Sequence, residues 1–145
     1  MTFPAPIPGL VIRYSYLWRS EYLRGKEEGV KDRPCAVLLA VTDEAGDQKV
    51  IVLPITHTAP NDAAHAVEIP AATKRRLGLD DDRSWIVVTE ANRFTWPGPD
   101  LRLAISGDPA SVAYGELPSA LFEQVREKWL ALFKAHRAHV VVRTE

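Results

Sequence analysis

Two apolar runs separated by a short polar break are the strongest constraint on how this chain folds. Residues 34–41 and 50–55 are rich in Val, Leu and Ile, and residues 43–47 between them read Asp-Glu-Ala-Gly-Asp. Apolar runs of strand length that flank a turn-like break predict a β-hairpin. In a hairpin the start of the first strand lies beside the end of the second, so residues far apart in the segment become neighbours.

The open end of this hairpin carries polar side chains of chemical interest. Arg33 precedes the first strand, and Thr56 and His57 follow the second. A guanidinium, a hydroxyl and an imidazole that converge at a sheet edge can bind a phosphate and assist its chemistry. A solvated strand end followed by a turn gives the same pattern, so the spacing alone leaves both interpretations open.

Length and composition indicate one globular domain. The chain has 145 residues, of which 46% are hydrophobic and 26% charged, and we expect residues 1–145 to form a single domain. A formal net charge of −1 excludes a general basic field, so any polyanion site must be a local patch. The one cysteine, Cys35, cannot form an intrachain disulfide, and its place in an apolar run predicts a buried, inert thiol.

The sequence gives no signal for export or membrane insertion. Residues 1–8, Met-Thr-Phe-Pro-Ala-Pro-Ile-Pro, predict an extended lead-in without the charged and apolar regions of a signal peptide. No apolar run approaches the roughly 18 residues that a membrane span needs. We therefore expect a cytoplasmic protein without a membrane partner.

Short strands recur on both sides of the hairpin. Strand-like patterns occupy residues 10–18, 65–69, 84–89 (which 90–94 continue or follow), 103–106 and 113–115. The charge-dense residues 19–32 contain two glycines and predict a surface loop rather than the short helix that they can also form. Residues 140–145 are interpreted as a final strand or a tail.

Two helices are predicted. Pro70 and Gly78 bracket the first, and the basic residues 74–76 in its last turn fit either the helix dipole or contact with a polyanion. The second begins at Ser119 and extends to about residue 136, because apolar side chains recur at helical spacing: Leu121, Phe122, Val125, Trp129, Leu132 and Phe133. Five to seven short strands and a C-terminal α-helix that closes one face predict a mainly β (α+β) fold, curved into a small barrel.

We expect a protein that works without a metal ion or cofactor. Asp80, Asp81 and Asp82 are consecutive and cannot all face one ion, so we interpret them as a solvated turn. His136 and His139 have no carboxylate or cysteine at a metal-binding spacing.

Several short motifs, taken in order, resemble the PemK/MazF toxins of type II toxin–antitoxin systems. Pro8-Gly9 precedes the first strand, Arg33-Pro34 ends the charged segment, and Pro54-Ile55-Thr56 closes the hairpin. Glu90 lies three residues before Arg93, which matches an acidic–X–X–arginine segment of the family. The resemblance covers most of the chain.

The resemblance implies an SH3-like or plasmid-maintenance-toxin barrel that pairs as a symmetric homodimer. It also implies a metal-independent endoribonuclease, an mRNA interferase that cuts single-stranded RNA, inhibits growth and is neutralised by a cognate antitoxin. The family's arginine, threonine and acidic residue map onto Arg33, Thr56 and Glu90. The alternative is a non-enzymatic toxin of the same barrel class that poisons DNA gyrase, or a plain binding module.

The chemistry of RNA cleavage assigns roles to these residues. When the 2′-hydroxyl attacks the adjacent phosphorus, Arg33 suits the charge that grows on the phosphoryl oxygens, and Thr56 can orient the attack. Glu90 and His57 are both candidates for the base and the acid, and the sequence leaves that assignment open. The expected RNA-binding residues are cations of a phosphate track and aromatic rings that stack bases if they are exposed: Arg24, Lys26, Lys31, Arg93, Phe94 and Trp96.

Three features depart from the family pattern. Val88 stands where some members carry an arginine, the charged segment 19–32 is longer than the family needs, and residues 96–99 (Trp-Pro-Gly-Pro) have no counterpart that we can place. These departures leave the cleavage specificity open.

Overall fold

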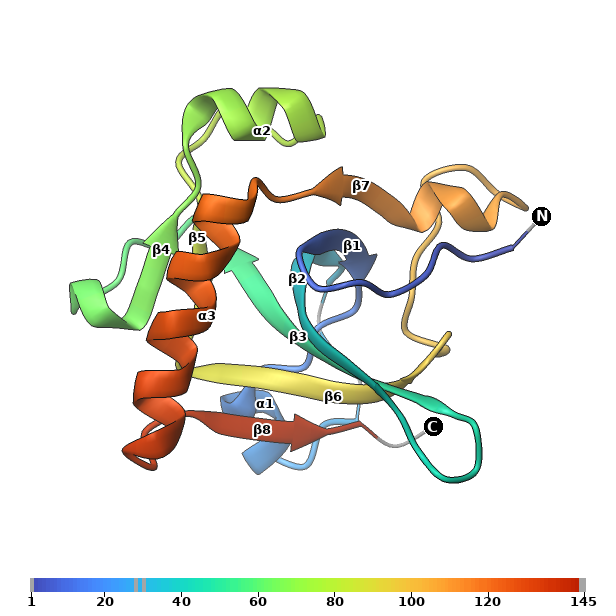
Figure 1. Cartoon of the computed structure of the whole chain (residues 1–145), viewed down its shortest axis with the longest axis horizontal. Coiled ribbons are helices and arrows are strands. Elements are labelled where there is room, and N and C mark those ends of the chain that lie inside the picture. Colours follow the sequence, from blue (N-terminus) through green and yellow to red (C-terminus); the bar gives the residue numbers. More distant parts are fainter. Residues whose placement is uncertain (1, 28, 30, 144–145) are drawn as a thin grey trace.

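The structure, a computed structural model, describes residues 2–27, 29 and 31–143. Within these residues the chain forms eight strands and three α-helices (Figure 1). In chain order they are β1 (Leu10–Tyr14), α1 (Arg19–Leu23), β2 (Arg33–Thr42), β3 (Gln48–Thr56), β4 (Ala66–Glu68), α2 (Ala71–Leu77), β5 (Trp85–Val87), β6 (Glu90–Trp96), β7 (Ala113–Glu116), α3 (Ser119–Lys134) and β8 (His139–Val142). None of the described helices has the length and hydropathy that a membrane crossing requires.

The mainly β fold with a helix near the C-terminus is confirmed, but three details differ from the prediction. The strands number eight rather than five to seven, in part because the C-terminal segment forms β8. Residues 19–23 form a helix, since the Glu21 carboxylate accepts a hydrogen bond from the Trp18 amide (3.1 Å) and caps the first turn. Residues 103–106 form no strand. Residues 28 and 30 of the expected loop lie outside the described residues.

The hairpin of β2 and β3 is the centre of the sheet. On one side β2 pairs with β1, and β1 pairs with β7. The other edge of β3 is divided between two strands, because residues 48–52 pair with β6 whereas Ile55 and Thr56 pair with β5. β5 continues to β4 in antiparallel pairing, and β6 continues to β8 in parallel pairing. The sheet therefore branches at β3, just before the strand ends (Figure 1).

α3 covers one face of this sheet. Its buried side chains Leu121, Val125, Trp129 and Leu132 belong to one apolar cluster with Leu53 and Ile55 of β3. The predicted stripe is thus confirmed for these four residues, whereas Phe133 is 52% exposed and stacks on Trp129. This packing fixes the C-terminal half of β3 from one side.

A second, aromatic cluster fills the opposite face. Val50 and Val52 of β3 alternate with the residues that face α3 and pack against Tyr14, Phe94 and Trp96. Cys35 lies in the same cluster and is fully buried, as expected for an inert thiol, and burial raises its pKa. Because β3 is held between two cores, the polar residues at its end have a fixed location.

Candidate active site

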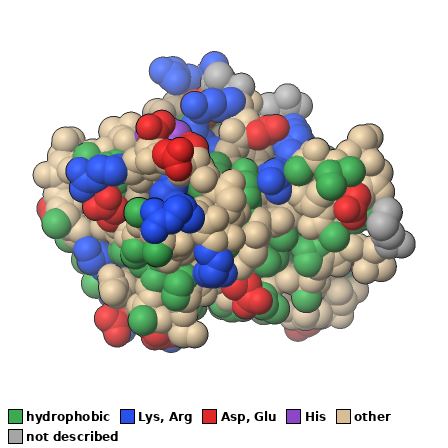
Figure 2. All heavy atoms as spheres, turned by 90° about the horizontal axis from the view of Figure 1, so that it is seen from above, with side chains coloured by type: hydrophobic (Ala, Val, Ile, Leu, Met, Phe, Trp, Pro, Cys, Tyr) green, Lys and Arg blue, Asp and Glu red, His purple; other side chains and the backbone are tan. Residues whose placement is uncertain are grey.

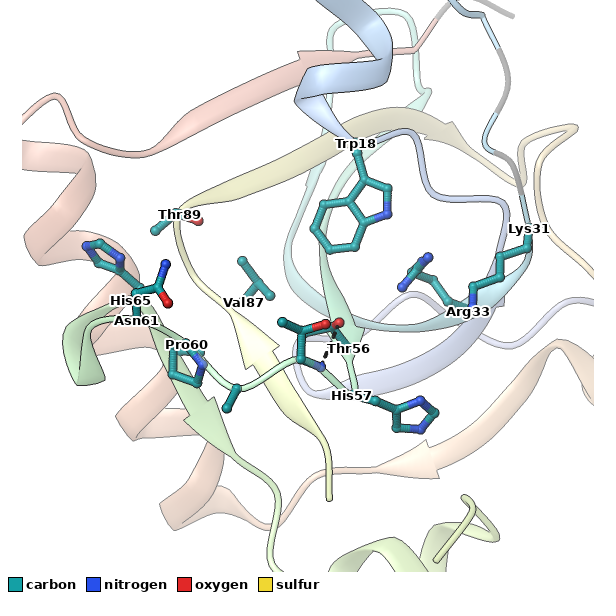
Figure 3. A pocket seen from close by; sticks show the side chains of 13 residues that line it. Trp18, Lys31, Arg33, Thr56, His57, Pro60, Asn61, His65, Val87 and Thr89 are labelled. Carbon is teal, nitrogen blue, oxygen red and sulfur yellow. Dashed lines mark hydrogen bonds between the residues drawn. The ribbon is translucent and has the colours of Figure 1, made fainter. Parts of the chain in front are cut away.

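A pocket of about 580 Å³ opens at the end of the hairpin where β2 begins and β3 ends (Figure 3). Its walls come from five separate segments of the chain, which the folded sheet brings together. The lining residues are Trp18, Lys31, Arg33, Thr56, His57, Thr58, Ala59, Pro60, Asn61, His65, Ala66, Val87 and Thr89. The pocket brings together Arg33, Thr56 and His57, as the hairpin prediction expected.

Arg33 faces Thr56 because of the hairpin register. Cys35 pairs with Pro54, and the same antiparallel register, continued by two residues on each strand, sets Arg33 opposite Thr56. The Arg33 guanidinium carbon lies 4.8 Å from the centre of the Trp18 ring, so stacking on an aromatic face holds the side chain in place.

The charge of Arg33 is not neutralised by the protein. Within the described part of the chain, its side chain forms no ion pair, and its buried Nε has no hydrogen-bond partner. A buried donor without a partner costs free energy unless a ligand or water supplies an acceptor. Arg143 has the same unpaired Nε, so the feature that makes Arg33 a candidate anion-binding residue is that its charge has no acidic partner among the described residues.

The Thr56 hydroxyl is oriented by the turn that follows β3. Its Oγ1 accepts a hydrogen bond from the Thr58 amide at 3.2 Å. A hydroxyl has one proton to donate and two lone pairs, so Thr56 retains its O–H for a ligand oxygen. The turn begins at this residue, which lets His57 lie on the rim of the same pocket instead of on the opposite face of the strand.

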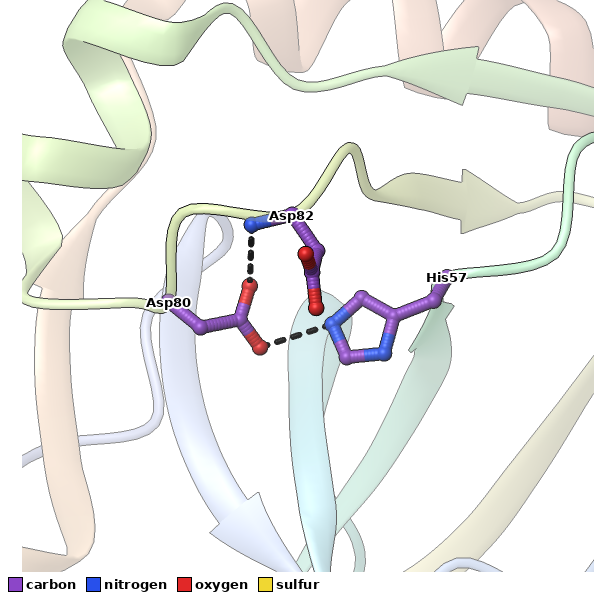
Figure 4. Close-up of side chains that lie close together, drawn as sticks. All are labelled: His57, Asp80 and Asp82. Carbon is purple, nitrogen blue, oxygen red and sulfur yellow. Dashed lines mark hydrogen bonds and ion pairs between the residues drawn. The ribbon is translucent and has the colours of Figure 1, made fainter.

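His57 is held by the turn that follows α2. Its Nε2 lies 2.7 Å from Oδ2 of Asp80 (Figure 4). Asp80 in turn accepts a hydrogen bond from Lys74 at 2.6 Å. A second hollow of about 210 Å³ adjoins the first and shares Lys31, Arg33, Thr56 and His57 with it. His57 and Arg33 therefore line both hollows.

One group of side chains in the described residues has metal-binding chemistry. The ligand atoms of His57, Asp80 and Asp82 lie within 4.8 Å of one another, although all three residues are exposed (Figure 4). The Lys74 ammonium already forms an ion pair with Asp80. Its positive charge would repel a divalent cation bound at the same carboxylate. We interpret the group as a hydrogen-bonded network rather than a metal centre.

Of the two interpretations of the basic run 74–76, contact with a polyanion does not fit its first member. The Lys74 side chain is 5% exposed and points into the protein, where it reaches Asp80 and Ser84. Arg76 donates to the Glu116 carbonyl at 2.6 Å. Helical periodicity alone does not reveal this, because the acceptors of Lys74 lie on a turn outside the helix.

Glu90, one of the two candidates for the base and the acid, does not line the pocket. Its Oε1 accepts hydrogen bonds from the Tyr16 hydroxyl at 3.1 Å and from the Arg19 amide at 2.9 Å. Burial raises the pKa of Glu90, against the lowering effect of those two hydrogen bonds. The preceding residue, Thr89, lines the pocket instead, because neighbouring residues of an extended chain point in opposite directions.

The expected RNA-binding residues are dispersed. Lys31 lines the pocket, whereas Arg24, Lys26 and Arg93 are exposed elsewhere, and Lys26 borders a separate hollow beside Arg143. Figure 2 shows one face of the molecule, on which basic side chains are interspersed with acidic ones and form no continuous field.

Base stacking by Phe94 and Trp96 is excluded by their burial. They are 3% and 8% exposed and belong to the aromatic core, where Phe94 stacks on Tyr14 at 4.7 Å. Alternation along β6 puts them on the inner face of the sheet. Trp18, which is half-buried and lines the pocket, is the aromatic side chain that a base can reach.

The sequence interpretation missed the outer wall of the pocket. The sequence analysis assigned no role to residues 58–61, yet Pro60 and Asn61 line the cavity beside His65 (Figure 3). Their direct sequence continuity with Thr56 and His57 is the signal that points to them.

Comparisons with models of known families and with curated proteins find no match for this chain. The geometry of the site and the motif resemblance are therefore the two grounds for assigning a function.

Proposed function

We propose that this protein is a metal-independent endoribonuclease that cleaves single-stranded RNA, in the manner of the PemK/MazF toxins. The observation that carries the proposal is the Arg33 guanidinium, anchored on Trp18, without an acidic partner among the described residues, and opposite Thr56 in a pocket rimmed by His57. An unneutralised arginine beside a free hydroxyl is an arrangement that binds a phosphodiester.

The reaction that these groups support is attack by the substrate's own 2′-hydroxyl. The 2′-oxygen forms a bond to the adjacent phosphorus while the bond from phosphorus to the 5′-oxygen breaks, which leaves a 2′,3′-cyclic phosphate and a 5′-hydroxyl. Arg33 stabilises the charge that develops on the phosphoryl oxygens. Thr56 donates to the phosphate and fixes the line of attack. His57, the pocket's titratable group beside Thr56, exchanges the proton.

The remaining volume of the pocket suits a nucleobase. Trp18 and Val87 supply apolar surface, while Asn61, His65 and Thr89 supply hydrogen-bonding groups at the far end (Figure 3). Such a cavity admits a base only when the base is unpaired and turned out of a helix. Single-stranded RNA is therefore the substrate class that the site favours.

The proposal includes the architecture and partners of the family. The branching of the sheet at β3 supports a comparison with an SH3-like, plasmid-maintenance-toxin barrel. The resemblance adds a symmetric homodimer and a cognate antitoxin that covers the groove. Light scattering of the purified protein, alone and with the product of a neighbouring small gene, tests both partners.

The deciding experiment is cleavage of a mixed-sequence single-stranded RNA in EDTA. We expect products with 2′,3′-cyclic phosphate ends and a loss of about 10²–10³-fold in rate for Arg33→Ala. Arg126→Ala is the matched control, because it removes the same charge from the exposed face of α3. Intact RNA across all sequences with the wild-type protein would contradict the proposal and favour the gyrase-poison or binding-module alternative.

Thr56→Ala gives an independent test of the geometry. Loss of the hydroxyl should reduce the rate by about 10–100-fold, because the phosphate loses an orienting donor. Thr42→Ala makes the same chemical change at the exposed, closed end of the hairpin and should leave the rate unchanged. Equal effects of the two substitutions would rule out a role for Thr56 in the reaction.

A further inference from the structure

Lys74 is a buried cation that the reaction described above does not use. Its ammonium donates to Asp80 Oδ1 at 2.6 Å, to Ser84 Oγ at 2.7 Å and to the backbone carbonyl of Asp82. Its three protons thus have three acceptors, and its side chain is 5% exposed. Removing an ammonium from water is costly even when it is paired, and a favourable position near the helix C-terminus does not require burial.

The carboxylate that Lys74 contacts is fixed from several directions. Oδ1 of Asp80 also accepts a hydrogen bond from the Asp82 amide at 3.2 Å, and Oδ2 contacts His57 Nε2 at 2.7 Å (Figure 4). The hydrogen bond from Lys74 holds the pKa of Asp80 below its usual range, and that from His57 adds to the effect. Asp80 is therefore a carboxylate at neutral pH, although half of its side chain is exposed.

An ionised carboxylate can only accept hydrogen bonds, and this settles the proton on the ring. In neutral His57 the proton must lie on Nε2, where it is donated to Asp80. Nδ1 then carries the lone pair, and it has no hydrogen-bond partner among the described residues. The nitrogen that can take a proton from a substrate is thus the one left free at the pocket rim.

We infer that Lys74 and Asp80 are positioning residues, which act through a chain of charged hydrogen bonds to fix the orientation and the tautomer of His57. The catalytic part of this inference rests on the proposed ribonuclease function, while the tautomer itself does not. Lys74 supplies the fixed charge, Asp80 accepts hydrogen bonds from both Lys74 and His57, and Nδ1 of His57 is left as the ring nitrogen that can take a proton.

The tautomer is measured directly by ¹⁵N-detected NMR of the full-length protein at about pH 8.5, where an ordinary histidine is neutral. We expect His57 to show the Nε2–H form in the wild type and a mixture of both forms in Asp80→Ala. Asp81→Ala is the matched control, because it removes a neighbouring exposed carboxylate that does not contact His57. Equal spectra for Asp80→Ala and the wild type would overturn the inference. A His57 signal that changes on addition of EDTA would assign the group to a bound metal and also overturn it.

Kinetics on the same variants separates this inference from the function on which it partly rests. Asp80→Ala should lower kcat by at least about 10-fold with KM within twofold, because general acid–base catalysis is lost while phosphate binding by Arg33 persists. Asp81→Ala should leave both constants unchanged. Lys74→Met should give the same kcat loss wherever thermal melting shows it folded, and a folded, fully active Asp80→Ala variant overturns the catalytic role. The wild type can also show a fixed His57 tautomer and cut no RNA. That outcome would contradict the ribonuclease proposal but would still support the role of Lys74 and Asp80 in fixing the tautomer.

Discussion

Two arginines in this molecule have opposite surroundings. The Arg143 side chain is 1% exposed and forms an ion pair with Asp100 at 3.1 Å. It also donates to the Ser15 carbonyl at 2.6 Å, to the Tyr14 hydroxyl and to the Asn92 amide oxygen. Arg33 is only half-buried, stacks on Trp18, and has no acidic partner in the part of the chain that the structure describes.

This difference in surroundings distinguishes a structural guanidinium from one that can bind a ligand. The hydrogen bonds of Arg143 tie β1, β6 and the C-terminal segment together, and its two terminal nitrogens are paired inside the fold, although its Nε has no partner among the described residues. Arg33 is fixed by stacking, a contact that leaves the planar fork of donors free for an oxyanion. The number of protein acceptors around an arginine therefore distinguishes the structural residue from the candidate catalytic one.

The largest expected effect is on stability, from Arg143→Ala. This substitution leaves the Asp100 carboxylate, whose side chain is 12% exposed, without its cation, and should lower the free energy of unfolding by about 3–5 kcal/mol. Urea denaturation measures the loss. Arg33→Ala is the comparison variant and should cost only about 0.5–1 kcal/mol, the value of a cation–π contact. Similar losses in the free energy of unfolding for Arg143→Ala and Arg33→Ala would contradict the distinction between a structural and a ligand-binding arginine.

A smaller effect is expected when the aromatic support of Arg33 is removed. Trp18→Leu keeps apolar bulk but loses the ring face, and it should weaken binding of a non-cleavable single-stranded RNA by about 5–100-fold. Trp85→Leu is a close match, because Arg83 lies 4.9 Å above that ring, yet neither residue lines the pocket. Fluorescence polarisation at one salt concentration compares them. An equal loss of affinity for both variants would show that the tryptophan acts through stability alone.

The part of this comparison that could be predicted from sequence is the hairpin. The apolar runs on either side of residues 43–47 predict the hairpin, and the hairpin brings Arg33 beside Thr56 and His57. The β-bulge between Val37 and Leu39 shifts the register by one residue and sets Arg33 opposite Thr56, and no sequence signal indicated it. The apolar stripe of α3 was equally readable, since its period matches the helix. Local pattern thus placed the catalytic candidates at one end of the sheet.

The partners of charged groups could not be predicted in the same way. Lys74 and Arg143 are buried because acceptors from distant segments surround them, and no spacing within their own elements indicates this. Glu90, which the motif resemblance suggested as a site residue, turns toward Tyr16 and Arg19. Sequence periodicity tells which face a side chain occupies, whereas tertiary packing decides what that face meets.

The smallest expected effect concerns two partly buried carboxylates, Asp100 and Glu90. Asp100 faces the Arg143 cation, whereas Glu90 accepts hydrogen bonds, within the described residues, from the neutral Tyr16 hydroxyl and Arg19 amide, and burial raises its pKa. The folded state then binds the Glu90 proton more tightly than the unfolded state does. Stability must therefore fall as pH rises from the ordinary glutamate pKa to the raised value, and the penalty is complete above that value.

Glu90→Gln removes this titration while its amide oxygen can still accept both hydrogen bonds. We expect the melting temperature of the variant to match the wild type near pH 4 and to exceed it by about 1–3 °C at pH 7. Glu127→Gln, on the exposed face of α3, should give a difference that does not change with pH. A variant that is less stable than the wild type at pH 7 would mean that the charge of Glu90 is favourable in the fold, as it is for Asp100. The two carboxylates would then belong to the same class, and the contrast between the regions would be limited to the arginines themselves.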